Sequence, residues 1–405
     1  MTLGSDRESR AGDELARQLL DMGILPPEWA ATLRAVPRSR FLPDLFWAYD
    51  MATGRSEPLS RSDDPGGWEL AAYRDIPLVT QWDDGQHTGT RPGTVGTSSA
   101  SMPSVVVSML RDLDVSDGTR VLEVGTGTGW NAGLLAHRLG SDQVVSVEID
   151  ATVAARASDA LARAELNPRV VVGEGADGWP AGAPYDRVIV TAGVRRLPAA
   201  WLEQTRPGGI ILAPWGTHYS NQDALVRLTV NEDGRAAGPF LRMVEFMKLR
   251  DQRLDWDLFR EHVQAFPGDA QVSRTPFTLA DLGDRYDTSY FVTGLCVPEC
   301  AHAVNMGASD GSGEAGGAKA WFFDFLSRSW AAVVFAADTP HATVYQSGPR
   351  HLWNEVERAL TWWIENGRPD LDRFGLSVDR DGGTRPWLDD PSNFLPFSNR
   401  ATGPR

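Results

Sequence analysis

The glycines of VLEVGTGTGW, residues 121–130, carry the clearest chemical signal in this sequence. A buried strand, 120–124, runs into three glycines at alternate positions: Gly125, Gly127 and Gly129. Glycine tolerates positive φ and lets a ligand touch the backbone, so such a turn at a strand end predicts nucleotide binding. The dinucleotide pattern G-x-G-x-x-G is not met, because the third glycine comes one residue early and Trp130 takes its place.

Acidic residues follow at spacings that suit the same ligand. Glu148 lies in a second apolar strand, 144–149, where an acidic side chain can accept hydrogen bonds from both ribose hydroxyls. Its spacing from the glycines suits NAD and S-adenosylmethionine equally, and a solvated carboxylate is the alternative. The segment GEGADGWP, 173–180, follows a third strand. There we expect Glu174 near the adenine amino group, and Asp177 as a residue that stabilises the turn.

Strands and helices alternate around these residues as a parallel sheet requires. The apolar pattern predicts five strands, at 120–124, 144–149, 170–172, 187–191 and 209–213. It predicts three helices between them, at 103–113, 131–139 and 151–166. This alternation indicates an α/β fold with a doubly wound, Rossmann-like sheet.

The regions on either side of this core differ from it in character. Upstream, we expect short amphipathic helices at 14–22 and 28–36, a loop at 51–70, and a flexible connector or functional loop at 81–101. Downstream, the sequence predicts a linker at 306–318, paired strands at 330–336 and 342–346, and a helix at 352–366.

Three parts follow from this organisation. We expect N-terminal helices with a substrate-side loop, the nucleotide-binding core, and a C-terminal α+β extension, at 1–102, 103–250 and 251–405.

Bulk properties exclude several classes of protein. The net charge of −15 repels phosphate backbones, so we expect no nucleic-acid partner. The two cysteines, Cys296 and Cys300, are typical of reduced thiols, and we expect no metal. No apolar run is long enough for a signal peptide or a membrane span, so we expect a soluble, cytoplasmic protein without a membrane partner.

With the glycine loop placed, the chain resembles protein-L-isoaspartate O-methyltransferases over roughly residues 30–250. The resemblance is carried, in order, by LRAVPRSRFLP (33–43), TSSASMPSVVVSML (97–110), the E-x-G-x-G-x-G loop, APYDRVIVTAGVRRLPAAWLEQTRPGGIILAPWG (183–216) and VEFMKLR (244–250). Three positions depart from the family pattern: Met102 replaces Gln or Ala, Glu174 replaces Asp, and Lys248 replaces Pro. These departures concern the substrate rather than methyl transfer.

The resemblance implies a class I methyltransferase with the cofactor S-adenosyl-L-methionine. It places Glu123 where it helps to orient the methionine part, directly or through water. The cofactor-binding residues it implies are Glu123, Gly125, Thr126, Gly127, Gly129, Glu148, Ile149, Gly173, Glu174 and Gly175. It places Ser101 near the methyl group as the catalytic candidate, and we expect substrate contacts from Ser98, Ser99, Thr191 and Ala192. Arg195 and Arg196 either attract an anionic substrate or are ordinary surface residues.

The C-terminal part resembles an extension found in a subset of this family that is associated with ribosomally made peptides such as lanthipeptides, lasso peptides and graspetides. We therefore expect the enzyme to esterify an aspartyl carboxylate in a constrained precursor peptide, leading to a succinimide (aspartimide) or isoaspartate. Trp353, Trp362 and Trp363, with Arg350, either supply a peptide-binding surface or belong to the core.

Two alternatives compete with this expectation. One is repair of isoaspartyl residues in damaged proteins, and the other is a non-catalytic peptide-binding module with the same fold. The complete glycine loop favours catalysis. It disfavours an NAD-dependent oxidoreductase because of its third glycine and Trp130.

Overall fold

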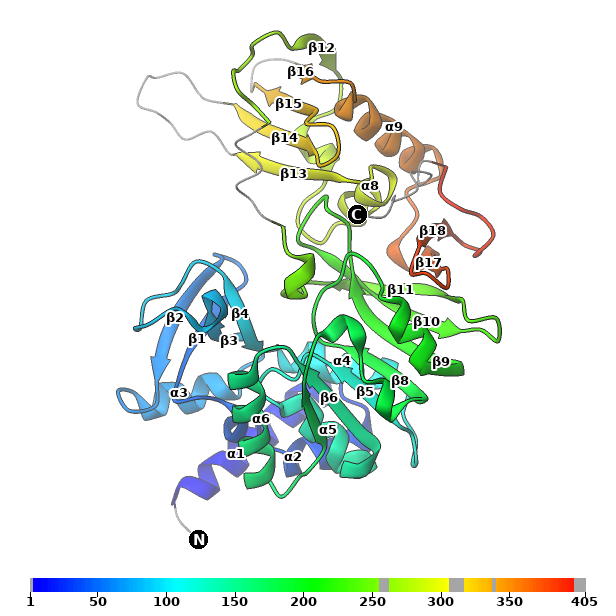
Figure 1. Ribbon diagram of the computed structural model, residues 1–405. Coiled ribbons are helices and arrows are strands. Elements are labelled where there is room, and N and C mark those ends of the chain that lie inside the picture. The colour runs from blue at the N-terminus through cyan, green and yellow to red at the C-terminus, as the bar shows by residue number, and fades with distance from the viewer. Residues whose placement is uncertain (1–2, 255–261, 306–316, 337–339, 397–405) are drawn as a thin grey trace. The chain divides into compact units, whose positions relative to one another are not determined.

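The computed structural model describes residues 3–254, 262–305, 317–336 and 340–396 (Figure 1). The chain forms two compact units. The first comprises Met1–Ala192, Pro198–Ala213 and Thr229–Arg235, and the second comprises Gly193–Leu197, Pro214–Leu228 and Ala236–Arg405. The division predicted at residues 102 and 250 stays a prediction about domains.

The first unit is organised around parallel strands in the order β9-β8-β5-β6-β7. These are β5 (Val121–Val124), β6 (Val144–Glu148), β7 (Arg169–Val172), β8 (Tyr185–Val190) and β9 (Thr205–Trp215). The helices between them are α4 (Pro103–Leu113), α5 (Trp130–Leu139), α6 (Ala151–Arg163) and α7 (Ala199–Gln204). The predicted doubly wound fold is confirmed. Because β5 pairs with β6 on one side and β8 on the other, the strand order reverses at β5, where such folds bind ligands.

Local chemistry explains where these helices begin. Pro103 and Pro27 occupy first-turn positions, where a missing N–H breaks no helical hydrogen bond. The carboxylate of Asp150 caps α6 by accepting hydrogen bonds from the N–H groups of Thr152 and Val153 at 2.9 and 3.1 Å. The cap therefore fixes the start of α6 two residues after the end of β6.

The N-terminal part of this unit contains more regular structure than predicted. Helices α1 (Leu3–Asp21) and α2 (Pro27–Ala35) precede a four-stranded antiparallel sheet in the order β2-β1-β3-β4. Its strands are β1 (Leu45–Asp50), β2 (Arg55–Ser60), β3 (Leu78–Trp82) and β4 (Gly96–Ala100), with α3 (Pro65–Ala72) between β2 and β3.

The expectation of a loop at 51–70 was therefore wrong. Much of this segment lies in β2 and in α3, where Asp64 caps the helix and Pro65 opens it. The expected connector at 81–101 is wrong at its end, because 96–100 pair with β3. The residues between are also fixed: the Asp83 carboxylate accepts hydrogen bonds from Thr94 and Val95, and Trp47 Nε1 donates to Thr90.

A buried arginine joins these N-terminal segments to the start of α4. Arg38 is only 1% exposed, and its guanidinium carbon lies 5.6 Å from the centroid of the Trp130 ring. Burial lowers the pKa of Arg38 to about 9, so the group still carries its charge at neutral pH. It donates to five backbone carbonyls at 2.9–3.3 Å: those of Ala72, Arg74, Ile76, Ala100 and Ser101.

The second unit contains two sheets. One has the order β18-β17-β11-β10, from β10 (Asp223–Val230), β11 (Ala236–Val244), β17 (Phe374–Val378) and β18 (Thr384–Leu388). The other has the order β12-β16-β15-β14-β13, from β12 (Gln271–Thr275), β13 (Cys300–Asn305), β14 (Ala318–Asp324), β15 (Trp330–Phe335) and β16 (Ala342–Ser347). Helices α8 (Thr288–Cys296) and α9 (Leu352–Glu365) complete the unit.

The structure confirms the predicted pairing of β15 with β16 and the helix α9. The linker expected at 306–318 lies outside the described residues except for its last two. Lys248, which departs from the family pattern, is buried in this unit and donates to both Asp223 carboxylate oxygens at 2.8 and 2.9 Å.

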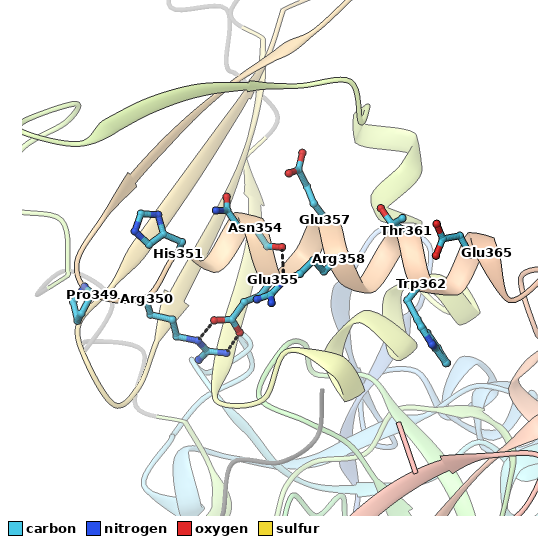
Figure 2. A pocket seen from close by; sticks show the side chains of 10 residues that line it. All are labelled: Pro349, Arg350, His351, Asn354, Glu355, Glu357, Arg358, Thr361, Trp362 and Glu365. Atoms are coloured by element: carbon cyan, nitrogen blue, oxygen red, sulfur yellow. Dashed lines mark hydrogen bonds and ion pairs between the residues drawn. The ribbon is translucent and has the colours of Figure 1, made fainter. Parts of the chain in front are cut away.

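One face of the tryptophan-rich helix α9 is buried in the core of the second unit. Trp353 is 1% exposed, and Arg350 is buried with its guanidinium on Asp324 and Glu355. Figure 2 shows the Arg350–Glu355 pair at one end of a pocket that runs along α9, with Trp362 near the other end. Of the three tryptophans on α9, Trp353 is buried, whereas Trp362 and Trp363 are half-buried and keep a partly accessible surface.

Replacement of Arg38 tests this scaffold. Arg38→Met keeps similar bulk but removes every donor, so we expect the free energy of unfolding of the first unit to fall by about 3–5 kcal/mol. Arg38→Lys should recover only part of this, because an ammonium lacks the planar fork. Hydrogen exchange across 72–76 and 100–101 measures the local effect, with the exposed Arg40→Met as the matched control. Exchange equal to wild type in Arg38→Met would contradict the role.

Candidate functional site

The glycine loop has a backbone that residues with a side chain rarely adopt. Gly125, Gly127 and Gly129 have φ of 96°, 54° and 86°. A Cβ placed on Gly125 would lie 2.7 Å from Thr191 Oγ1, and one on Gly129 would lie 3.1 Å from Ala157 Cβ. The loop is therefore tightly enclosed by the first unit itself, and glycine is required both for conformation and for space.

Glu123 lies in β5, two residues before the first glycine of this loop. It is fully buried in β5, where its carboxylate accepts hydrogen bonds from Ser146 Oγ on β6 and from Asn131 Nδ2 at 2.7 Å. Thr126 Oγ1 lies 2.6 Å from the same Ser146 hydroxyl. Burial raises the pKa of Glu123 to about 7, and the two hydrogen bonds oppose that rise. Glu123 thus joins two strands and the start of α5, and contact with the methionine part stays a prediction.

Glu148 lies half-buried at the carboxyl end of β6, beside the glycine loop. Its carboxylate accepts hydrogen bonds from Gly127 N–H at 2.9 Å and from Asp150 N–H at 3.1 Å. Ile149 follows it and is also half-buried. This is the position from which an acidic residue of a doubly wound fold reaches a ribose.

The adenine-side segment follows β7. Gly173 and Gly175 are half-buried and Glu174 is exposed, and Gly173 N–H donates to Glu148 O at 3.0 Å. The backbone carbonyl of Asp177 accepts a hydrogen bond from Gln204. The segment therefore lies beside the end of β6, as the predicted adenine contact requires.

The serine segment meets the glycine loop. A Cβ placed on Gly127 would lie 3.5 Å from the Ser99 carbonyl oxygen and 4.0 Å from Ser98 Oγ. Ser98 is buried in β4 and accepts a hydrogen bond from Thr80 Oγ1 at 3.3 Å. Ser101 follows β4, is half-buried, and has its carbonyl fixed by Arg38. The structure thus brings the predicted substrate residues and the predicted cofactor loop together.

Thr191 and Ala192 complete this edge of the sheet. Thr191 Oγ1 donates to Gly125 O and lies 3.1 Å from Val124 O, so its hydroxyl is engaged with the loop. Both residues are half-buried directly after β8. Arg195, in the second unit, is buried and donates to Thr217 O, so it is neither a surface arginine nor open to a substrate. Arg196 is exposed.

Sequence reasoning missed the residues that hold these segments in place. Gln81 joins the serine segment to α6: its Nε2 donates to Asp150 Oδ2 at 3.1 Å, and its Oε1 accepts from Thr97 Oγ1 at 2.9 Å. Arg38 lies within LRAVPRSRFLP (33–43), one of the segments that carry the family resemblance, and this was the available signal. Nothing local marks Gln81, because its partners lie 16 and 69 residues away in the sequence.

Within residues 3–254, 262–305, 317–336 and 340–396, no three His, Cys, Asp or Glu side chains gather in a way that could hold a metal ion. Nor does any helix in those ranges have the length and apolar character needed to cross a bilayer. Cys296 and Cys300 are buried free thiols, and burial raises the pKa of each to about 12.

This arrangement suits a displacement reaction better than acid–base chemistry. A carboxylate is ionised at neutral pH and needs no general base, so a site that attacks with one must mainly align the reacting atoms and exclude water. The hydroxyls of Ser101 and Thr191 and the backbone of the glycine loop are groups of that kind.

Comparison with known proteins identifies the family. Residues 64–254 match the family model "Protein-L-isoaspartate(D-aspartate) O-methyltransferase". Protein-L-isoaspartate O-methyltransferase 1 of Rhodopseudomonas palustris is 34% identical over 216 residues, which cover 53% of this chain and 72% of that relative. The Pyrococcus horikoshii protein-L-isoaspartate O-methyltransferase is 41% identical over 135 residues, 33% of this chain and 60% of that relative's length.

A solved structure described as a protein-L-isoaspartate O-methyltransferase has a TM-score of 0.52, with 21% identity over 94% of this chain and 100% of that one, which supports the fold. These matches confirm the predicted family, and with it the enzyme class, a carboxyl O-methyltransferase, and the cofactor class, S-adenosyl-L-methionine. The chain belongs to the protein-L-isoaspartate O-methyltransferase family.

Proposed function

We propose that this protein transfers the methyl group of S-adenosylmethionine to the side-chain carboxylate of an isoaspartyl residue in a peptide or protein. The observation that carries the proposal is the proximity of Gly127 to the Ser98–Ser99 segment, since a Cβ placed on Gly127 would lie 3.5 Å from Ser99 O and 4.0 Å from Ser98 Oγ. It sets the predicted cofactor and substrate residues against each other in one compact unit. Family membership supports the choice of an isoaspartyl substrate.

The residues divide the work between holding the cofactor and placing the acceptor. The glycine loop, Glu148 and Glu174 would hold the cofactor, which supplies an electrophilic methyl on a sulfonium. Ser101 would orient the acceptor carboxylate, because its backbone is fixed by Arg38 and its hydroxyl can donate a hydrogen bond. An oxygen–carbon bond forms as the sulfur–carbon bond breaks, so alignment and exclusion of water are the main requirements.

The methyl ester that forms can close to a succinimide without the enzyme. The following backbone nitrogen attacks the ester carbonyl, its proton leaves with the methoxy group as methanol, and a succinimide ring results. Hydrolysis of that ring gives aspartate or isoaspartate. This sequence of steps accounts for a repair function.

A second candidate is favoured by the residues beyond the family match. Residues after 254 include a five-stranded sheet, α8 and α9, with a pocket along α9 lined by charged side chains and Trp362. A repair enzyme that accepts many peptides gains little from such a surface, whereas a tailoring enzyme gains selectivity from it. The second candidate is therefore methylation of an L-aspartyl residue in a constrained, ribosomally made precursor peptide.

Gly127→Val tests the cofactor site. A β-branched side chain at φ 54° is strained, and its Cβ would stand 3.5 Å from Ser99 O, so we expect S-adenosylmethionine affinity to fall by roughly a hundredfold or more. Gly118→Val is the matched control, because Gly118 has φ 81° but nothing within 4 Å of its Cβ position. Calorimetry that finds unchanged binding in folded Gly127→Val would remove the loop from the site.

Ser101→Ala tests the acceptor side. We expect kcat to fall on the order of ten- to a thousandfold through lost orientation, while the Kd for S-adenosylmethionine stays near the wild-type value. Ser104→Ala, three residues further along in α4, is the control and should leave both constants unchanged. Wild-type turnover by Ser101→Ala would exclude a role for its hydroxyl.

One peptide sequence prepared in three forms separates the two candidate substrates. The forms are linear with isoaspartate, linear with L-aspartate, and cyclised with L-aspartate. Our proposal predicts that mass spectrometry finds an added methyl, then loss of methanol, only on the isoaspartyl form. Methylation confined to the cyclised L-aspartyl form would favour the second candidate instead.

A further inference from the structure

The adenine-side loop, 173–179, rests on three buried side chains that are not among the expected cofactor contacts. Trp201 and Gln204 come from α7, and Tyr185 begins β8. Their exposed fractions are 0%, 5% and 1%. None of the three can reach solvent, so each must find its hydrogen-bond partners inside the first unit.

The side-chain polar groups of all three residues bind the backbone of this one loop. Trp201 Nε1 donates to Gly175 O at 2.9 Å, and Tyr185 Oη donates to Trp179 O at 2.8 Å. Gln204 makes two bonds: Nε2 donates to Asp177 O at 2.7 Å, and Oε1 accepts from Trp179 N–H at 2.8 Å. Four hydrogen bonds from rigid elements thus hold a loop of seven residues at three points.

Gly178 shows how closely the amide of Gln204 fits the loop. It has φ of 60°, and a Cβ placed on it would lie 2.6 Å from Gln204 Oε1 and 3.1 Å from Nε2. Any other residue would push the amide away from its two partners. Burial also raises the pKa of Tyr185 to about 12, which keeps its hydroxyl a donor through the neutral range.

We infer that Trp201, Gln204 and Tyr185 are positioning residues for the adenine ring, because they fix the loop that carries Glu174 at Gly175, Asp177 and Trp179 before the cofactor arrives. This inference rests on the proposed function. A loop ordered in advance loses less conformational entropy on binding, so the three side chains contribute to affinity without touching the ligand.

The position of α7 in the chain makes this support specific to the adenine side. The glycine loop follows β5 and is supported by Glu123 and Ser146, which belong to β5 and β6. The adenine-side loop is supported by β8 and α7 instead. Loosening the second support should therefore weaken recognition of adenine and leave the methionine side unaffected.

Conservative substitutions of the three residues test this inference. Gln204→Glu keeps the acceptor for Trp179 but loses the donor to Asp177, while Trp201→Phe and Tyr185→Phe keep a ring and lose one donor each. Glu203→Gln is the matched control, since Glu203 is exposed on the same helix. Calorimetry on the full chain uses S-adenosylhomocysteine and S-inosylhomocysteine, which differ only at C6 and N1 of the base. It is run at a temperature where circular dichroism shows every variant folded.

We expect each of the three variants to bind S-adenosylhomocysteine roughly three- to tenfold more weakly, in line with the loss of one buried hydrogen bond. The preference for S-adenosylhomocysteine over S-inosylhomocysteine should fall as well, whereas Glu203→Gln should match wild type. A purely structural role would lower the melting temperature without changing that preference.

Unchanged affinity and unchanged preference in all three variants would overturn the inference while leaving the proposed function intact. If the wild type bound no S-adenosylhomocysteine, the proposed function itself would be wrong, and the inference with it.

Discussion

The buried charge of Arg38 is the constraint on which the rest of the site depends. A guanidinium that leaves water must find acceptors for its donors, and here it finds five backbone carbonyls in two separate segments, 72–76 and 100–101. Those segments can satisfy it only by lying side by side. The start of α4, and with it Ser101, is therefore placed by a buried cation that binds backbone carbonyls, with the charge of Asp75 near enough to favour its protonated form. The N-terminal helices and β1–β4 are thus part of the scaffold of the catalytic unit.

Around this point the site is assembled by backbone packing more than by charged side chains. The glycine loop is enclosed by Thr191 and Ala157, which leave little room for a Cβ on Gly125 or Gly129, and the Ser99 carbonyl lies within van der Waals reach of a Cβ on Gly127. Glu123 and Ser146 join the two central strands behind the loop, and Gln81 links the serine segment to the cap of α6. A rigid site of this kind suits a reaction whose barrier is lowered chiefly by alignment.

Local patterns predicted most of the core and much of the site. Apolar periodicity located β5 to β9 and α4 to α6, because this signal depends on neighbouring residues. The glycines and Glu148 lie together at one edge of the sheet, and ligand binding there stays a prediction. Strand β2 was missed, since its polar composition resembles a loop and only its pairing with β1 reveals it. The partners of Gln81, Gln204 and Arg350 lie across the fold, and a single sequence does not specify such distant contacts. Trp353 and Arg350, which the sequence left open as surface or core, are core because α9 packs on a sheet.

The most direct test of the central claim is a crystal structure of the protein with S-adenosylhomocysteine and an isoaspartyl peptide. Our account predicts the homocysteine part against Gly125–Gly129, the ribose hydroxyls on Glu148, the adenine beside Glu174, and the peptide carboxylate within hydrogen-bond distance of Ser101 Oγ. A cofactor bound elsewhere, or a peptide whose carboxylate lies away from the contact between Gly127 and the serine segment, would contradict it.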